Sequence, residues 1–331
     1  MSAASSFYSV QSPLLSAAEV DHDVHGLREA MKGIGKDMDV LVTILGKRTP
    51  NQGEQIGKAY KANFGEDLVK KLHSEVGGHV GHLLQDLVKP LARVDAEALY
   101  HAVHGVGTDE ATVIEVLVGR SNAEIKAMKE AFFDVYEKKM EKFVESDFGG
   151  NMKKLVTILL QGERPESEAA MDVDLDVERL YKAGEGKWGT DEAEFFSVLC
   201  NRSDAHLKKV FAAYEKKHNK PFTTVVKKEF SGDLEKALLL LLDSVNDRPL
   251  FVAEQIEKCF GMLNTNEEKL IRLMIRHREP AIMAQVKEAY AKRYGVSLRH
   301  KIEKKTGMGL EKALRFLAHN AKPLMFAGQH L

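Results

Sequence analysis

Apolar residues recur three and four positions apart in four stretches of the chain, which predicts four helices with one buried stripe each. Each stretch follows a short turn, and its apolar positions form three columns when the turns are aligned: Leu41, Val113, Phe195 and Leu270; Ile44, Val116, Val198 and Leu273; Leu45, Leu117, Leu199 and Met274. With one extra residue allowed in the fourth copy, two later columns also match: Leu68, Met140, Phe222 and Leu298; Leu72, Val144, Val226 and Ile302. One helical unit therefore occurs four times.

The aligned turns are KGIGKD at 32–37, HGVGTD at 104–109, KWGTD at 187–191 and the weaker copy MLNTNE at 262–267. Their matching residues, Lys36, Thr108, Thr190 and Thr265, follow one another at intervals of 72, 82 and 75 residues. Within each unit of roughly 70 residues, helical segments alternate with short turns, and no segment shows sustained alternation of period two. The predicted fold class is all-α.

The repeat also predicts how the chain is divided. Between the second and third copies lies ERPESEAAMDVDLD, an acidic stretch without periodicity that is typical of a linker. The predicted parts are an N-terminal tail at 1–19, repeat 1 at 20–90, repeat 2 at 91–162, the linker at 163–176, repeat 3 at 177–247, and repeat 4 with the C-terminal end at 248–331.

Composition and charge limit the classes of partner that the protein is expected to bind. Hydrophobic residues make up 44% of the chain and charged residues 29%, which is typical of a soluble globular protein. Because 48 Lys and Arg face 49 Asp and Glu, the net charge of -1 gives no general attraction to nucleic acid or to anionic membranes. Binding to either needs a local patch or an added cation, and no nucleic-acid partner is expected.

The sequence shows no targeting signal, membrane span or catalytic motif. The first residues lack the basic and apolar regions of a secretory signal, and the apolar run at 237–242 is far shorter than the ~20 residues of a membrane span. We expect a cytoplasmic protein, with export that needs no signal peptide left open. No GxSxG, HExxH or Cys–His pattern supports an enzyme.

A carboxylate lies 42 residues after the first glycine position of three turns: Glu75 after Gly33, Asp147 after Gly105, and Glu229 after Lys187. Calcium takes 6–8 oxygens, often backbone carbonyls together with a carboxylate. A glycine-rich turn can point carbonyls at an ion, and a distant carboxylate can close the site. The remaining positions fall to water or to a lipid phosphate, so the pattern predicts Ca²⁺ sites that open toward a membrane. Magnesium is expected to fit poorly.

With four repeats, a short tail, a longer connection between repeats two and three, and K/H-G-x-G-T-D-type turns with a downstream acid, the chain resembles an annexin. The resemblance covers nearly the whole chain. It implies five helices per repeat, a slightly curved disc with calcium turns on its convex face, and reversible, calcium-dependent binding to acidic phospholipids such as phosphatidylserine.

The resemblance also implies the ligands of each site, which are carbonyls of the turn and one carboxylate. They are Met31, Gly33, Gly35 and Glu75 in repeat 1; Val103, Gly105, Gly107 and Asp147 in repeat 2; and Gly184, Lys187, Gly189 and Glu229 in repeat 3. Repeat 4 departs from this pattern. It has Met262 and Asn264 in place of glycines and Lys304 or Lys305 in place of the acid, so its site is expected to be inactive. Lys36, where the family usually has threonine, is expected to remove a helix cap but no calcium ligand.

Several residues have a plainer interpretation. His73, His79 and His82 flank Glu75, but without a cysteine or a His-x3-His pair we interpret them as surface or partly buried histidines and not as zinc ligands. The same holds for His101 and His104. The recurrent Arg48, Arg120 and Arg202 are expected to join helix ends by hydrogen bonds to carbonyls.

Trp188, the only tryptophan, lies in a turn and is a candidate for membrane contact together with Lys187. The sequence leaves open whether its indole is exposed or folded into a pocket in the absence of calcium. The alternative function is a calcium-regulated protein scaffold whose tail docks a partner through Phe7, Tyr8, Val10, Leu14 and Leu15. Self-association on membranes is a further possibility that the sequence does not decide.

Overall fold

The computed structural model describes residues 12–33, 35–167 and 171–319. Twenty α-helices make up this part of the chain, and its only β-type pairing is an isolated antiparallel bridge between Phe260 and Thr265. The predicted all-α fold of four repeats with five helices each is confirmed. None of the helices in the described ranges is long and apolar enough to cross a bilayer.

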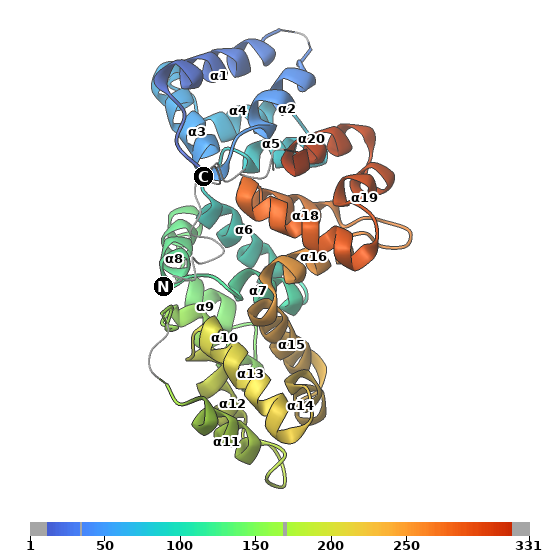
Figure 1. The fold of residues 1–331 in the computed structure, drawn as a ribbon. Coiled ribbons are helices and arrows are strands. Elements are labelled where there is room, and N and C mark those ends of the chain that lie inside the picture. Colours follow the sequence, from blue (N-terminus) through green and yellow to red (C-terminus); the bar gives the residue numbers. More distant parts are fainter. Residues whose placement is uncertain (1–11, 34, 168–170, 320–331) are drawn as a thin grey trace, which may run out of the picture. The chain divides into compact units, whose positions relative to one another are not determined.

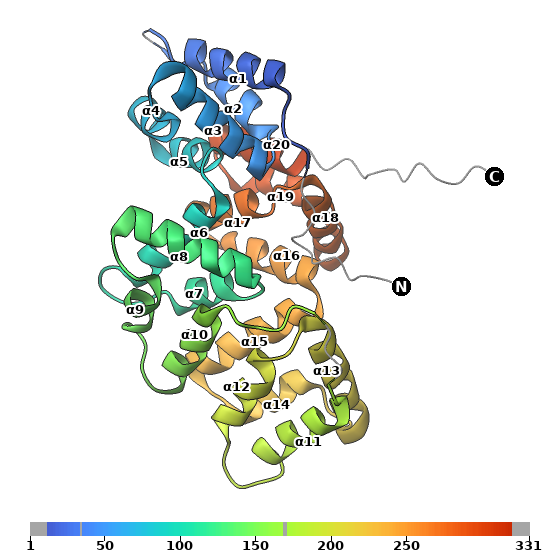
Figure 2. The same cartoon turned by 90° about the vertical axis from the view of Figure 1, so that its left-hand side faces the viewer.

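The helices form two compact units, one of residues up to 94 and from 249 onward, and one of residues 95–248. The first unit holds repeats 1 and 4, whose helices α2 and α20 lie side by side (Figures 1 and 2). Repeat 1 consists of α1 (Ala17–Ala30), α2 (Met38–Gly46), α3 (Pro50–Phe64), α4 (Leu68–Glu75) and α5 (Gly78–Asp86). Repeat 4 consists of α16 (Arg248–Cys259), α17 (Glu267–Arg276), α18 (Pro280–Tyr294), α19 (Leu298–Lys305) and α20 (Met308–His319).

The second unit holds repeats 2 and 3. Repeat 2 consists of α6 (Leu91–Val103), whose start belongs to the first unit, α7 (Glu110–Leu117), α8 (Asn122–Tyr136), α9 (Met140–Glu145) and α10 (Gly150–Gln161). Repeat 3 consists of α11 (Val173–Ala183), α12 (Glu192–Cys200), α13 (Asp204–His218), α14 (Phe222–Glu229) and α15 (Gly232–Asn246). α11 begins four residues before the end of the predicted linker, because Asp172 caps it by accepting a hydrogen bond from the Leu175 N–H at 3.1 Å. Likewise α1 begins at Ala17, inside the predicted tail.

The predicted apolar stripes are buried. Leu41, Val113, Phe195 and Leu270 each have a relative exposure of 0%, and the members of the other columns are also buried except Ile44, which is half-buried. Burying such side chains contributes about 1.5–3 kcal/mol each, which explains why these columns are apolar in all four copies. Cys200 and Cys259 are free thiols in the buried interior.

The recurrent arginines contact buried aspartates, which the sequence did not predict as their partners. Arg48 donates to Asp23 at 2.7 and 2.9 Å, and Arg120 donates to Asp95 at 3.2 Å. A buried carboxylate needs such partners because its charge would otherwise be desolvated without compensation. The segment between the second and third helices of each of these repeats is thereby tied to the first helix.

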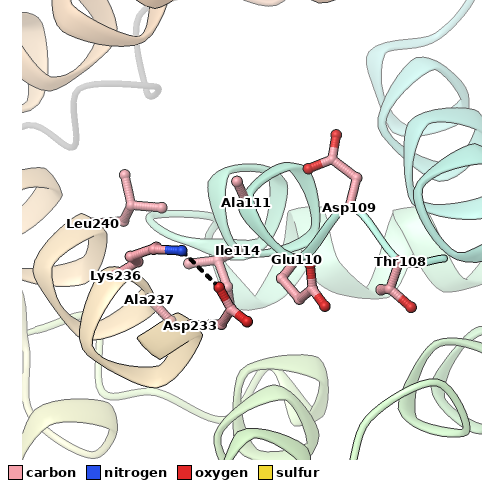
Figure 3. A pocket seen from close by; sticks show the side chains of 9 residues that line it. All are labelled: Thr108, Asp109, Glu110, Ala111, Ile114, Asp233, Lys236, Ala237 and Leu240. Carbon is pink, nitrogen blue, oxygen red and sulfur yellow. Dashed lines mark hydrogen bonds and ion pairs between the residues drawn. The ribbon is translucent and has the colours of Figure 1, made fainter. Parts of the chain in front are cut away.

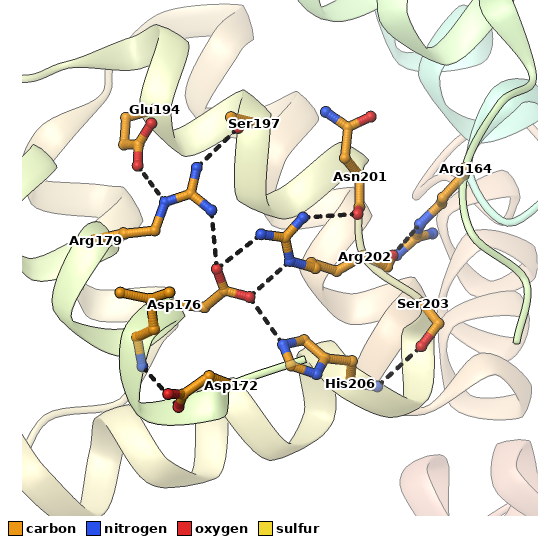
Figure 4. Close-up of polar contacts among 11 residues, drawn as sticks. Arg164, Asp172, Asp176, Arg179, Glu194, Ser197, Asn201, Arg202, Ser203 and His206 are labelled. Carbon is orange, nitrogen blue, oxygen red and sulfur yellow. Dashed lines mark hydrogen bonds and ion pairs between the residues drawn. The ribbon is translucent and has the colours of Figure 1, made fainter. Parts of the chain in front are cut away.

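Repeat 3 has the same contact with more partners. Arg202 donates to Asp176 at 2.7 and 3.0 Å, and His206 and Arg179 contact the same carboxylate (Figure 4). Arg202 also donates to the carbonyl of Asn201, at the end of α12, at 3.0 Å. The predicted bond to a helix end is therefore present in this repeat, beside the stronger link to the aspartate.

Candidate functional site

Each of the four turns connects the first and second helices of its repeat, and the same backbone hydrogen bond closes each turn. In each, a backbone N–H after the turn donates to a carbonyl before it: Asp37 to Ala30 at 2.9 Å, Asp109 to Ala102 at 2.7 Å, Asp191 to Ala183 at 2.7 Å, and Asn266 to Cys259 at 2.8 Å. The donor residue also caps the following helix through its side chain. The caps are therefore Asp37 and its equivalents, so the expectation that Lys36 removes a helix cap is wrong.

In repeat 2 the turn and its predicted acid lie together. Gly105 and Gly107 have φ of 119° and 87°, values that residues with a Cβ avoid, so glycine is required for this path. The Thr108 hydroxyl donates to a carboxylate oxygen of Asp147 at 3.2 Å. Val106, between the glycines, is fully exposed at the tip of the turn.

Repeat 3 has the same arrangement with one more residue in the turn. The Thr190 hydroxyl donates to Oε2 of Glu229 at 2.7 Å. A Cβ on Gly184 would lie 3.1 Å from Cδ of Glu229, so glycine permits this close approach. The Gly184 carbonyl oxygen accepts a hydrogen bond from the Lys187 N–H at 3.1 Å. If this oxygen bound an ion, it would interact with the ion and with the N–H at the same time. Trp188 is fully exposed in this structure.

In repeat 1 two ammonium groups hold the predicted acid. Lys36 Nζ lies 2.8 Å from Oε2 of Glu75, and Lys71 Nζ lies 2.9 Å from its Oε1. These hydrogen bonds, that of Lys36 first, lower the pKa of Glu75. Lys36 takes the place of the threonine in repeats 2 and 3, so a cation stands where their turns offer a neutral hydroxyl. The sequence showed Lys36 but not its partner, and it gave no reason to single out Lys71.

The turn of repeat 4 follows a different path. The β-bridge between Phe260 and Thr265 closes it, and neither Met262 nor Asn264 has positive φ. The Thr265 hydroxyl donates to the backbone carbonyl of Lys305 at 2.7 Å, and the Lys305 ammonium donates to the Gly261 carbonyl at 3.2 Å. Lys305, not Lys304, is thus the residue whose ammonium reaches the turn, and a cationic side chain there would repel a metal ion.

A hollow of about 350 Å³ lies beside the turn of repeat 2, between α7 and α15 (Figure 3). Asp109 and Glu110 line it from α7 and its cap. Asp233 and Lys236 line it from α15 and form a hydrogen-bonded pair at 2.9 Å. Three carboxylates and one ammonium group line the hollow, and the predicted ligands of the turn lie outside its lining.

The turns and their acids offer the kind of oxygen ligands that calcium requires. Turn carbonyls and a carboxylate are the oxygen donors that a hard cation prefers, and in repeats 2 and 3 a hydroxyl already holds the carboxylate against the turn. These residues therefore fit calcium. The same set is present in repeat 1, but an ion must compete there with two ammonium groups.

Comparisons with known proteins agree with this arrangement. The annexin family model matches residues 22–87, 94–159, 175–241 and 251–317. Rat annexin A6 is 36% identical over 298 residues, which cover 89% of this chain and 44% of that protein. The solved structure of annexin III has a TM-score of 0.86 at 33% identity, over 90% of this chain and 94% of that one. The structure of calcium-bound annexin (Sm)1 has a TM-score of 0.83 at 25% identity, over 92% of both chains. The chain spans about half the length of the annexin A6 and annexin A11 relatives that it matches, 44% and 58%.

Proposed function

Because this chain belongs to the annexin family, which is known for calcium-dependent phospholipid binding rather than catalysis, we propose that it binds acidic phospholipid membranes reversibly through its turns when calcium is present. The calcium ligands are those predicted for repeats 1–3, each a set of turn carbonyls closed by Glu75, Asp147 or Glu229. The turn of repeat 4 holds no calcium. The protein acts in the cytoplasm and moves to membranes as calcium rises.

The observation that carries this proposal is the pair of hydrogen bonds from Thr108 to Asp147 and from Thr190 to Glu229. Each joins a turn to an acid 39 residues further along the chain and brings that carboxylate next to the turn. A preorganised set of donors binds more tightly than one that must be assembled. A calcium ion held there keeps open positions for a lipid phosphate.

Calcium supplies the positive charge that the chain lacks. With a net charge of -1, the protein has no long-range attraction to an anionic bilayer, whereas each ion bridges protein and lipid oxygens. Several such bridges on one protein raise the overall affinity by roughly 10²–10⁴ over a single one. Removal of calcium breaks every bridge at once, so binding is reversible.

Exposed apolar residues at the turn tips support membrane contact. Val106 and Trp188 occupy the same place in the aligned turns, directly before Gly107 and Gly189, and both are fully exposed. Leu263 has this place in repeat 4 and is 92% exposed, beside Met262 at 94%. Tryptophan favours the interface between lipid headgroups and acyl chains, where its ring lies against hydrocarbon and its N–H stays hydrated. We propose that Trp188, with Lys187 near the phosphates, enters this layer when calcium is bound.

The proposal is tested with three carboxylates replaced together, Glu75→Gln, Asp147→Asn and Glu229→Gln. The triple variant is expected to lose co-sedimentation with phosphatidylserine vesicles at calcium concentrations that bind the unaltered protein fully. Asp233→Asn, which removes an exposed carboxylate away from the predicted ligands, is the matched control and should bind normally. Unchanged binding of the triple variant would mean that the turns do not hold the calcium.

A protein scaffold remains the alternative. Leu15, one of the predicted docking residues, is buried, and its backbone N–H and carbonyl both bond to Gln55, at 2.9 and 3.0 Å. Leu14 is exposed, while Phe7, Tyr8 and Val10 lie outside the described residues. Ser16 caps α1, so removal of residues 1–11 alone is the sharper test. Lipid binding should survive this deletion, and loss of a protein partner or of self-association on membranes would assign that role to the tail.

A further inference from the structure

Two histidines and a glutamate form a cluster within the first unit. His79 and His82 lie one helical turn apart on α5, and Glu268 lies in the first turn of α17. One ligand atom from each side chain lies within 4.8 Å of the other two, and all three side chains are exposed. Glu267 adds a second carboxylate, whose Oε2 lies 3.3 Å from Nε2 of His79.

The sequence gave these histidines the plainer interpretation because no cysteine or His-x3-His pair accompanies them. The structure supplies a third ligand from repeat 4, almost two hundred residues away along the sequence. The turn that precedes α17 is the one whose calcium ligands are replaced, so the glutamates at the start of this helix have no predicted part in a calcium site.

We propose that His79, His82 and Glu268 form a zinc site that joins repeat 1 to repeat 4. Two imidazole nitrogens and one carboxylate are ligands that Zn²⁺ favours, whereas Ca²⁺ and Mg²⁺ prefer oxygens alone. Zinc is four-coordinate in most protein sites, and Glu267 or a water molecule fills the fourth position.

The distances are compatible with zinc after small side-chain rotations. In a tetrahedral site, zinc–ligand bonds of about 2.0–2.2 Å place two ligand atoms about 3.3–3.6 Å apart. The observed limit of 4.8 Å therefore has to shorten by about 1.2–1.5 Å, and exposed side chains on two packed helices have the freedom to do this. The helices themselves need not move.

The first test measures Zn²⁺ binding to the metal-free full-length protein, without calcium or lipid, by competition with a chromophoric chelator. We expect one ion per chain, with affinity reduced at least about tenfold by His82→Ala and by Glu268→Gln. His73→Ala removes an exposed histidine outside the cluster and is the matched control. Co²⁺ should give the visible absorption of a four-coordinate site in the unaltered protein and not in the His82→Ala variant.

A second measurement tests the link between the repeats. An ion that binds only the folded protein and bridges α5 and α17 raises the midpoint of thermal unfolding of the first unit. Zn²⁺ is expected to raise this midpoint by several degrees in the unaltered protein and to leave the Glu268→Gln variant unchanged. Binding without a midpoint shift would refute the bridge, and equal loss in the His73→Ala control or no stoichiometric binding would refute the site. Because neither measurement involves calcium or lipid, failure here leaves the membrane proposal untouched.

Discussion

At position 36 a single side chain changes what a calcium turn can do. Repeats 2 and 3 have a threonine at the equivalent place, whose hydroxyl orients the carboxylate and leaves its charge available. Lys36 instead pairs with Glu75, and Lys71 pairs with its other oxygen, so two cations already neutralise the acid. An arriving calcium ion has to displace them. The turn of repeat 1 is therefore expected to be the weakest of the three sites.

Lys36→Thr is predicted to strengthen calcium binding in repeat 1. In a protein whose other sites are removed by Asp147→Asn and Glu229→Gln, calorimetry should show calcium binding that tightens by about tenfold or more upon this change. Lys32→Thr, which removes an exposed lysine paired with Glu29 and not with Glu75, is the control. Equal calcium affinity before and after the Lys36→Thr change would show that the ion pair does not limit the site.

Trp188 is the residue most directly placed to report on the membrane. Trp188→Ser is predicted to weaken vesicle binding several-fold, because the lost indole no longer enters the interfacial layer. Calcium binding in the absence of lipid should stay the same, since the side chain contributes no oxygen donor. Measuring both with the same protein separates these effects, and an equal loss in both would show that the substitution damages the turn itself.

At the scale of the elements, a buried aspartate on the first helix orders its repeat. Burial alone would raise the pKa of Asp176, but hydrogen bonds from Arg202 and His206 outweigh it, and the pKa is lowered. The same geometry recurs with Asp23 and Asp95. The proposed calcium turn and the second helix lie between the aspartate and its arginine in the chain, so the contact holds together the two ends of the segment that contains the turn.

Asp176→Asn is predicted to lower the free energy of unfolding by about 3–5 kcal/mol, because it leaves the half-buried Arg202 and the buried His206 without the carboxylate that they contact. Asp174→Asn, at an exposed site on the same helix, is the control. The difference between Asp176→Asn and the unaltered protein should shrink with acid. A lowered pKa in the folded state gives stability that is complete above the unfolded value of about 3.9 and is lost as the pH falls through the folded value. Urea unfolding at a series of pH values measures this, and a constant difference would contradict it.

Periodicity predicted the elements well and side-chain partners poorly. The apolar columns found the second helix of every repeat, because burial imposes the same spacing on each copy. The recurring carboxylates at 75, 147 and 229 indicated the acids that the structure brings to the turns. The partners of Arg202, Lys36 and His79 could not be predicted, since each comes from another helix and depends on how the helices pack. Comparison of the repeats shows only the positions that the copies have in common, whereas the contacts of these three residues depend on the tertiary structure.

For the whole molecule, each of the two units contains two of the four turns, but the turns of the two units differ in their side chains. The unit of residues 95–248 contains the turns of repeats 2 and 3, in which a threonine holds the acid. The other unit contains the turn with Glu75 between two lysines and the turn with Lys305 in place of an acid. Membrane binding should therefore depend mainly on Asp147 and Glu229.

The double variant Asp147→Asn, Glu229→Gln is predicted to need far more calcium for half-maximal vesicle binding than either single variant, because loss of the second bridge also removes the gain from multivalency. Glu75→Gln alone should change the calcium requirement little. Co-sedimentation of these variants and the unaltered protein over a range of calcium concentrations gives the comparison. A large effect of Glu75→Gln would mean that the first unit contributes equally.

Calcium at the turns is proposed to bring the protein to anionic lipid, and one titration tests this most directly. Calcium is added to the unaltered protein with phosphatidylserine vesicles, and sedimentation and Trp188 fluorescence are followed together. We expect binding that reverses on chelation, with a blue shift of the tryptophan emission over the same range of calcium concentrations. No binding at millimolar calcium would contradict the proposed mechanism.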